Sequence, residues 1–168
     1  MMFFRSTSSY EELGDQWVAY RKYLFSVQGR LPVDVFEFAT ARWHYDPADH
    51  RSLHDSWLQD MTVAEEQLEG AEESGRRRTT IELVLLAPYH DGVTTLFYSN
   101  VEAYTLSLQS SGEPNRHYST HGDWLVDEIR LSEQSKVLHE ISFSSGAHFL
   151  IECETIRHAT SAPATKEA

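Results

Sequence analysis

The most constraining feature of this sequence is a series of short segments in which apolar and polar residues alternate. A period of two is typical of β-strands, because successive side chains point to opposite faces of a sheet. Turn-forming pairs such as Asp91-Gly92, Gln134-Ser135 and Ser145-Gly146 separate these segments. The pattern predicts about six strands joined by turns, over residues 57–64, 79–86, 93–108, 124–132, 137–143 and 149–157.

A helical pattern precedes the strands. Ser9 and Glu12 have the spacing of a capping box, and an apolar stripe with helical spacing follows them. Gly29 is a suitable stop, so an amphipathic helix is predicted from Tyr10 to Gln28. The next segment, residues 33–45, is compatible with either a short helix or a strand. The stripe consists of Leu13, Trp17, Tyr20 and Leu24.

These elements predict an α+β fold, in which one N-terminal helix, or two, packs on an antiparallel sheet. The 168 residues suit a single domain, which we expect to span 1–158 with a flexible tail at 159–168. The acidic segment 65–74 indicates a long hairpin loop or local disorder. The sequence contains neither a Gly-rich phosphate loop nor βαβ alternation, which argues against a nucleotide-binding α/β fold.

The formal net charge of −12 restricts the partners. An acidic chain repels phosphate backbones and anionic lipid surfaces, so we expect binding to neither nucleic acid nor membrane. A basic protein partner or a cationic ligand would be attracted. The N-terminus lacks a secretory pattern and no segment approaches the ~20 apolar residues of a membrane span, so a cytoplasmic location is expected. The single cysteine, Cys153, lies in an apolar strand-like run and is expected to be buried.

Histidine and carboxylate side chains are densest between Trp43 and Trp57. These groups are ligands of zinc, iron and manganese, and His50 and His54 would share a face at i, i+4 if the segment were helical. The spacing matches no named metal motif, so we prefer a structural role to a metal site or a hydrolytic site. The candidate ligands, if a divalent metal binds, are His44, Asp46, His50, His54 and Asp55.

A second polar cluster surrounds Trp124 and includes His117 and His121. Carboxylates near a histidine can serve acid–base catalysis or bind a metal, although a turn at a loop–strand junction is the simpler explanation. An aromatic residue beside carboxylates can also anchor a contact with a basic partner. The sequence therefore predicts a partner-binding face made of Asp123, Trp124, Asp127 and Glu128.

Two segments carry a resemblance to a known group of proteins. Leu53-His54-Asp55-Ser56-Trp57-Leu58 begins a strand, and Leu96-Phe97-Tyr98-Ser99-Asn100-Val101 follows the Asp91-Gly92 turn. This order resembles small bacterial proteins with a His-Asp-Ser/Ala strand start and a later aromatic-x-Gly/Asn-Val strand. Several such families are uncharacterised, and some are classed as immunity proteins of polymorphic toxin systems. The similarity covers residues 53–155, and it implies a protein that occludes its toxin and has no catalytic residues.

The leading hypothesis is a non-enzymatic binding protein without a cofactor, with neutralisation of a toxin partner as its specific form. The acidic charge and the four Trp, eight Tyr and eight Phe residues support it, since aromatic side chains anchor interfaces. One alternative is a metal-dependent enzyme or metal-binding domain that uses the cluster from His44 to Asp55. The other is a β-rich module that binds a small ligand. The sequence has no G-x-S-x-G elbow, so a serine nucleophile has no support.

Overall fold

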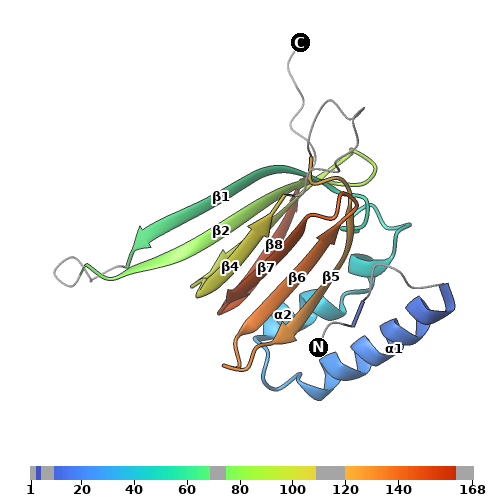
Figure 1. The fold of residues 1–168 in the computed structure, drawn as a ribbon, viewed down its shortest axis with the longest axis horizontal. Coiled ribbons are helices and arrows are strands. Elements are labelled where there is room, and N and C mark those ends of the chain that lie inside the picture. The colour runs from blue at the N-terminus through green and yellow to red at the C-terminus, as the bar shows by residue number, and fades with distance from the viewer. Residues whose placement is uncertain (1–2, 5–9, 69–74, 109–119, 162–168) are drawn as a thin grey trace, which may run out of the picture.

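The computed structural model describes residues 3–4, 10–68, 75–108 and 120–161, with the backbone alone for residues 10–13. Helices α1 (Tyr10–Ser26) and α2 (Val33–Thr40) and the 3-10 helix η1 (Arg42–Tyr45) come first (Figure 1). The predicted α+β class, with N-terminal helices on antiparallel β-structure, is confirmed. The strands of the described ranges are β1 (Trp57–Gln67), β2 (Arg77–Leu86), β3 (Val93–Ser99), β4 (Ala103–Ser107), β5 (Trp124–Leu131), β6 (Val137–Phe143), β7 (His148–Cys153) and β8 (Thr155–Ser161).

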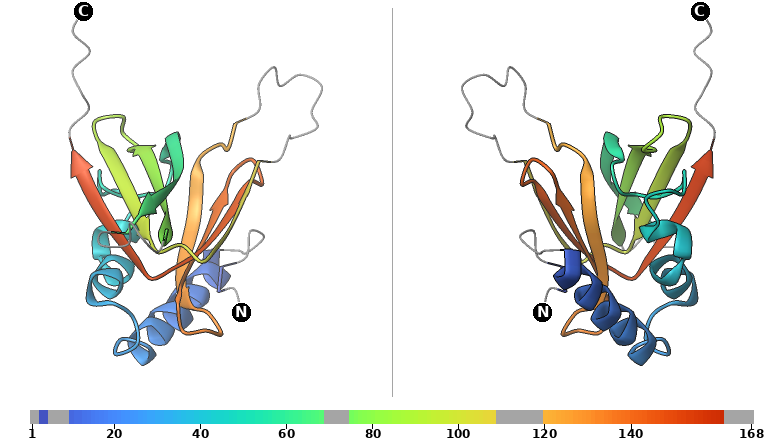
Figure 2. Two further views of the ribbon diagram at one scale, coloured as in Figure 1. Left: turned by 90° about the vertical axis from the view of Figure 1, so that its left-hand side faces the viewer. Right: turned by 90° about the vertical axis from the view of Figure 1, so that its right-hand side faces the viewer.

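These strands form two four-stranded antiparallel sheets instead of one meander. The order is β1-β2-β3-β8 in the first sheet and β4-β7-β6-β5 in the second. Figure 2 shows the sheets diverging like the arms of a V, with α1 and α2 at the end where the arms converge. Apolar side chains from both sheets and both helices meet in a common core.

The chain passes between the sheets at two neighbouring points, which explains why the structure has more strands than predicted. The segment 93–108 divides into β3 and β4 at Asn100, which has a φ of 50° that asparagine tolerates better than most residues. The segment 149–157 divides into β7 and β8 at Glu154, whose N–H donates to the Ser99 carbonyl at 3.1 Å. Neither point contains Gly or Pro, so the alternation continues through both corners.

Several element boundaries also differ from the prediction. Helix α1 ends at Ser26, and the ambiguous segment 33–45 is helical, first as α2 and then as η1. Strand β8 continues to Ser161, so residues 159–161 belong to the sheet and not to a tail. No helix within the described ranges is long and apolar enough to cross a membrane. Three predicted features lie outside the described residues: the cap at Ser9, residues 69–74 of the hairpin loop and residues 162–168 of the tail.

Helix α1 buries the described part of its predicted stripe, while the side chain of Leu13 lies outside the described residues. Tyr20 and Leu24 are fully buried, and Trp17 is partly buried. Trp17 packs against the ring of Tyr45 from η1 at a centroid distance of 4.3 Å. The helix is therefore held by aromatic contacts as well as by aliphatic burial.

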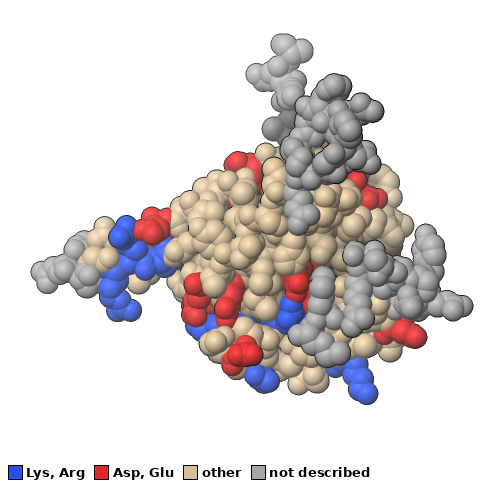
Figure 3. Space-filling model, in the orientation of Figure 1, with Lys and Arg blue, Asp and Glu red and all other residues tan. Residues whose placement is uncertain are grey.

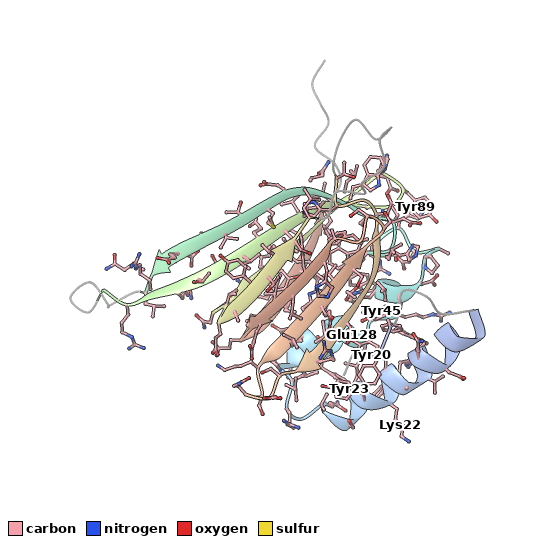
Figure 4. The ribbon with its side chains drawn as sticks, in the orientation of Figure 1. Tyr20, Lys22, Tyr23, Tyr45, Tyr89 and Glu128 are labelled. Carbon is pink, nitrogen blue, oxygen red and sulfur yellow. The ribbon has the colours of Figure 1, made fainter. Side chains whose placement is uncertain are left out.

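The tyrosines of α1 also cover the edge of the second sheet. Strand β5 is an edge strand, and such strands leave unpaired backbone groups. The hydroxyl of Tyr20 accepts a hydrogen bond from the N–H of Ile129 at 2.6 Å, and that of Tyr23 accepts one from the N–H of Leu131 at 2.8 Å. Figure 4 shows both tyrosines between α1 and the sheet. The helix thus satisfies donors that would otherwise be buried without an acceptor.

We predict that Tyr20→Phe, which keeps the ring and removes the hydroxyl, lowers the free energy of unfolding by about 1–3 kcal/mol. The N–H of Ile129 would then be buried without its acceptor. Urea denaturation followed by tryptophan fluorescence measures the change. Tyr104→Phe is the matched control, since its ring is 48% exposed, and it should shift stability by less than about 0.5 kcal/mol. Equal losses in the two variants would contradict the role of the hydroxyl.

Candidate functional site

The four residues predicted to form a partner-binding face are not together at the surface. Trp124, Asp127 and Glu128 are at most 3% exposed, and Asp123 alone is partly exposed. The prediction of a face made of all four is wrong for the three buried residues. A register shift between Trp124 and Val126 turns Trp124 to the same inner side as Asp127, although their spacing along a regular strand would place them on opposite sides.

Glu128 points to the outer side of the sheet but is covered by the N-terminal segment. The backbone N–H groups of Phe3 and Phe4 donate to its Oε2 at 2.7 and 3.2 Å. The Nε of Arg130 lies 2.6 Å from its Oε1. Burial raises the pKa of Glu128, although these donors and the Arg130 charge act in the opposite direction. This carboxylate therefore holds the chain start against β5 and is not free to bind a partner.

Asp127 is the centre of a buried polar network. Its Oδ1 accepts hydrogen bonds from the Trp124 indole N–H and from Nε2 of His44, both at 3.0 Å. Its Oδ2 accepts one from Nε2 of His139 at 3.0 Å, and Nδ1 of His139 lies 2.8 Å from the Tyr98 hydroxyl. All five side chains are at most 3% exposed. The network connects η1, β3, β5 and β6, and so joins both sheets to the helical segment.

The neighbours of each histidine constrain its protonation. His44 places Nε2 against the Asp127 carboxylate and Nδ1 against the Phe38 carbonyl, at 3.0 Å each. Both neighbours are acceptors, so both nitrogens must donate and His44 is an imidazolium. The second ring nitrogen of His139, Nδ1, faces the Tyr98 hydroxyl, which can donate to it or accept from it. Burial raises the pKa of Tyr98 well above its usual value, which keeps the hydroxyl proton in place.

The network is a structural centre, because solvent does not reach it. Burial alone would raise the pKa of Asp127, but the His44 charge and the hydrogen bonds from His139 and His44 hold that pKa far below its usual range. Asp127 therefore stays ionised beside the imidazolium. Buried ion pairs of this kind hold elements in register and are costly to break. Cys153 is buried as expected, and burial raises the pKa of its thiol to about 12.

The histidines and carboxylates between residues 44 and 55 are dispersed by the fold. His44 enters the core, whereas Nδ1 of His50 contacts Asp91 at 2.5 Å on the exposed surface. His54 contacts its neighbour Asp55 at 3.1 Å, and both side chains are exposed. Within the described ranges, no group of three or more His, Cys, Asp or Glu side chains is arranged to hold a metal ion.

A surface hollow of about 650 Å³ lies where β1 and β5 begin, and Asp123 lines it together with Trp57. The two residues form an isolated β-bridge, and the Trp57 indole N–H donates to Oδ1 of Asp123 at 2.8 Å. Trp57 is 47% exposed, so solvent reaches the hollow from the side of this residue. Ser144 donates from Oγ to Oδ2 of Asp123 at 3.3 Å. The hollow thus presents an aromatic ring and a carboxylate held in one orientation.

The backbone around Asp123 is shaped for this arrangement. Gly122 has a φ of 76°, and a Cβ at this position would collide with the Ser144 hydroxyl. That hydroxyl accepts a hydrogen bond from the Asp123 N–H at 2.8 Å. Burial lowers the pKa of His121, which also lines the hollow, so this ring favours its neutral form. No ion pair joins Asp123 to another residue of the described ranges, and its charge faces the hollow without a cation.

Sequence reasoning found Asp123 but missed Trp57 and Ser144. Trp57 lies in the alternating pattern of a strand, and the pattern alone does not distinguish an inner from an exposed aromatic residue. Ser144 is 21 residues from Asp123 and meets it only because β5 and β6 pair. The His117 of the same predicted cluster lies outside the described residues.

The surface charge is mixed on the face drawn in Figure 3, where basic and acidic side chains lie in small neighbouring groups. At the end of the β1–β2 hairpin, Arg77 pairs with Glu65 at 2.5 Å and Arg78 with Glu66 at 2.8 Å. In comparisons with known proteins, the chain matches no family model, no curated protein and no solved structure. The function of the protein must therefore be inferred from the chemistry of its individual sites.

We predict that Asp127→Asn lowers the free energy of unfolding by about 3–5 kcal/mol at neutral pH, because the buried His44 imidazolium loses its counter-charge. Asp60→Asn is the control, since it removes the same charge from an exposed position on β1. Denaturant titration of both variants beside the unmodified protein measures the difference.

The same comparison has an expected pH dependence. The pKa of Asp127 is lowered in the folded state, so its stabilisation is complete above the ordinary aspartate value of ~3.9 and decreases as pH falls below it. The stability gap between the unmodified protein and Asp127→Asn should therefore be smaller at about pH 3 than at pH 7. A gap that stays constant, or grows on acidification, would show that Asp127 is not the ionised partner.

Proposed function

We propose that this protein is a non-enzymatic binding protein that recognises a basic protein partner through the hollow at Trp57 and Asp123. The observation that carries the proposal is the pairing of a half-exposed indole with a carboxylate that has no cation among the described residues. An aromatic face and a carboxylate together are suited to an arginine or lysine side chain.

Asp123 can accept further hydrogen bonds, which supports this proposal. An ionised carboxylate has about four acceptor positions, and the neutral donors of Trp57 and Ser144 use two of them. The remaining positions can accept N–H groups from a guanidinium. The volume of about 650 Å³ is within the range of ligand-binding pockets, and it would admit a side chain together with part of its backbone.

The charge of the whole chain favours the same partner. At a net charge of −12, long-range attraction raises the rate at which a basic protein associates. Two other acid–base centres, the Asp127 network and the Cys153 thiol, are buried and so are not available for chemistry at the surface.

The specific form of the proposal is an immunity protein that neutralises a toxin. Its support is the resemblance of the two segments 53–58 and 96–101 to immunity-type proteins, together with the Asp123 carboxylate, which suits a cationic partner. Trp57 belongs to the first of these segments. On this proposal, the partner is a basic toxin, which contributes an arginine or lysine to the hollow.

The proposal is tested with tagged protein purified from its native host, in which a basic partner should co-purify. Binding of the isolated partner is then measured by calorimetry for the unmodified protein, Asp123→Asn and Trp57→Ala. Loss of a charge-assisted hydrogen bond should weaken binding about 10–100-fold for Asp123→Asn. Binding should also weaken as salt increases, because screening shortens the reach of the charges to ~8 Å at physiological ionic strength.

Asp60→Asn is the matched control, because it removes one negative charge from the exposed edge of the same strand as Trp57. It should retain nearly all of the affinity. If no partner co-purifies, or if the partner binds Asp123→Asn and Trp57→Ala as tightly as the control, the hollow is not the binding site. If the partner is a toxin, the unmodified protein should inhibit it at concentrations at which the Asp123→Asn variant leaves it active.

A further inference from the structure

A second hollow, of about 580 Å³, lies between α1 and η1. Trp17 and Arg21 of α1 line it from one direction, and Arg42 and Tyr45 of η1 line it from the other. It has no lining residue in common with the hollow at Trp57 and Asp123. We infer that this second hollow binds a small phosphate ester that also carries hydroxyl groups, a ligand class distinct from the basic partner proposed above.

The two arginines are the reason for an anionic ligand. Trp17 and Arg21 are four residues apart on α1 and therefore lie on one face of the helix. Arg42 is the first residue of η1, and both arginine side chains are exposed. Two arginines from separate elements thus line one hollow. Their planar arrays of N–H donors match the oxygen atoms of a phosphate.

Both arginines are also free of ion pairs within the described ranges. Four arginines pair closely with carboxylates, for example Arg51 with Asp49 at 2.8 Å and Arg78 with Glu66 at 2.8 Å, whereas Arg21 and Arg42 share the unpaired state of Arg30, Arg76 and Arg157 within the described ranges. The hollow is therefore lined by two unpaired arginines and one carboxylate, Asp46. The two guanidinium charges can pair with an anionic group such as a phosphate.

The remaining walls of the hollow account for the other parts of the ligand. Trp17 and Tyr45 pack together at a centroid distance of 4.3 Å and form an apolar wall (Figure 4 labels Tyr45). Asp46 also lines the hollow, and its Oδ1 accepts a hydrogen bond from the Ala48 N–H at 3.0 Å. Its second oxygen can accept from a hydroxyl group. A carboxylate beside two arginines therefore favours a phosphorylated, hydroxyl-bearing molecule over inorganic phosphate.

The experiment measures binding by calorimetry with four probes, which are inorganic phosphate, ribose, ribose 5-phosphate and adenosine monophosphate. We expect the two phosphate esters to bind at least about tenfold more tightly than phosphate or ribose alone. Arg21→Gln and Arg42→Gln should each weaken binding of the esters about tenfold or more. Both side chains are exposed and unpaired within the described ranges, so the variants should fold, which circular dichroism checks.

Lys22→Gln is the matched control. Lys22 follows Arg21 on α1 but points away from the body of the protein, and it does not line the hollow (Figure 4). This variant loses the same unit of charge and should bind the esters like the unmodified protein. Esters that bind no better than ribose would overturn the inference, and so would equal losses in Lys22→Gln and the two arginine variants. Preference for adenosine monophosphate over ribose 5-phosphate would extend the site to the base, whereas equal binding would restrict it to the sugar phosphate.

Discussion

Asp127 places a carboxylate in the middle of the core, and the packing of the surrounding elements is organised around it. An ionised group at this depth requires a counter-charge and donors for its lone pairs. His44 supplies the charge, and Trp124 and His139 supply further hydrogen bonds. Because these residues come from η1, β5 and β6, the carboxylate can be satisfied only when the helical segment is docked on the second sheet. Tyr98 extends the same requirement to the first sheet through its bond to His139.

Side-chain hydrogen bonds also protect the edge of the second sheet. Strand β5 has no neighbouring strand on its outer side, and α1 replaces that neighbour with tyrosine hydroxyls that accept from Ile129 and Leu131. The N-terminal residues Phe3 and Phe4 add donors for Glu128. Helix and chain start thereby cover a strand that would otherwise be open to pairing with another chain. The polar side chains Asp127 and Glu128 of β5 are therefore used for folding.

The two hollows differ in the charge that they present. One combines Trp57 with the unpaired carboxylate of Asp123, and the other combines Trp17 with the unpaired guanidinium groups of Arg21 and Arg42. An aromatic wall occurs in both, so the charged groups decide which ligand each hollow favours. Opposite preferences on one small protein can coexist because each charge acts mainly within a screening length of ~8 Å at physiological ionic strength.

The sequence by itself determined the fold class and the positions of most helices and strands. The apolar stripe of Tyr20 and Leu24, the period-two segments and the turn at Asp91-Gly92 depend on local chemistry, which neighbouring residues express directly. The tertiary structure decided where the polar residues lie. A register shift after Trp124 placed that residue on the same inner side of the sheet as Asp127, and a left-handed Asn100 divided one apparent strand between two sheets. Asp123 could be predicted as a binding residue from its sequence neighbours. Trp57 is 66 residues away and contacts Asp123 only through tertiary packing. Burial and long-range pairing depend on the whole chain, and no local pattern records them.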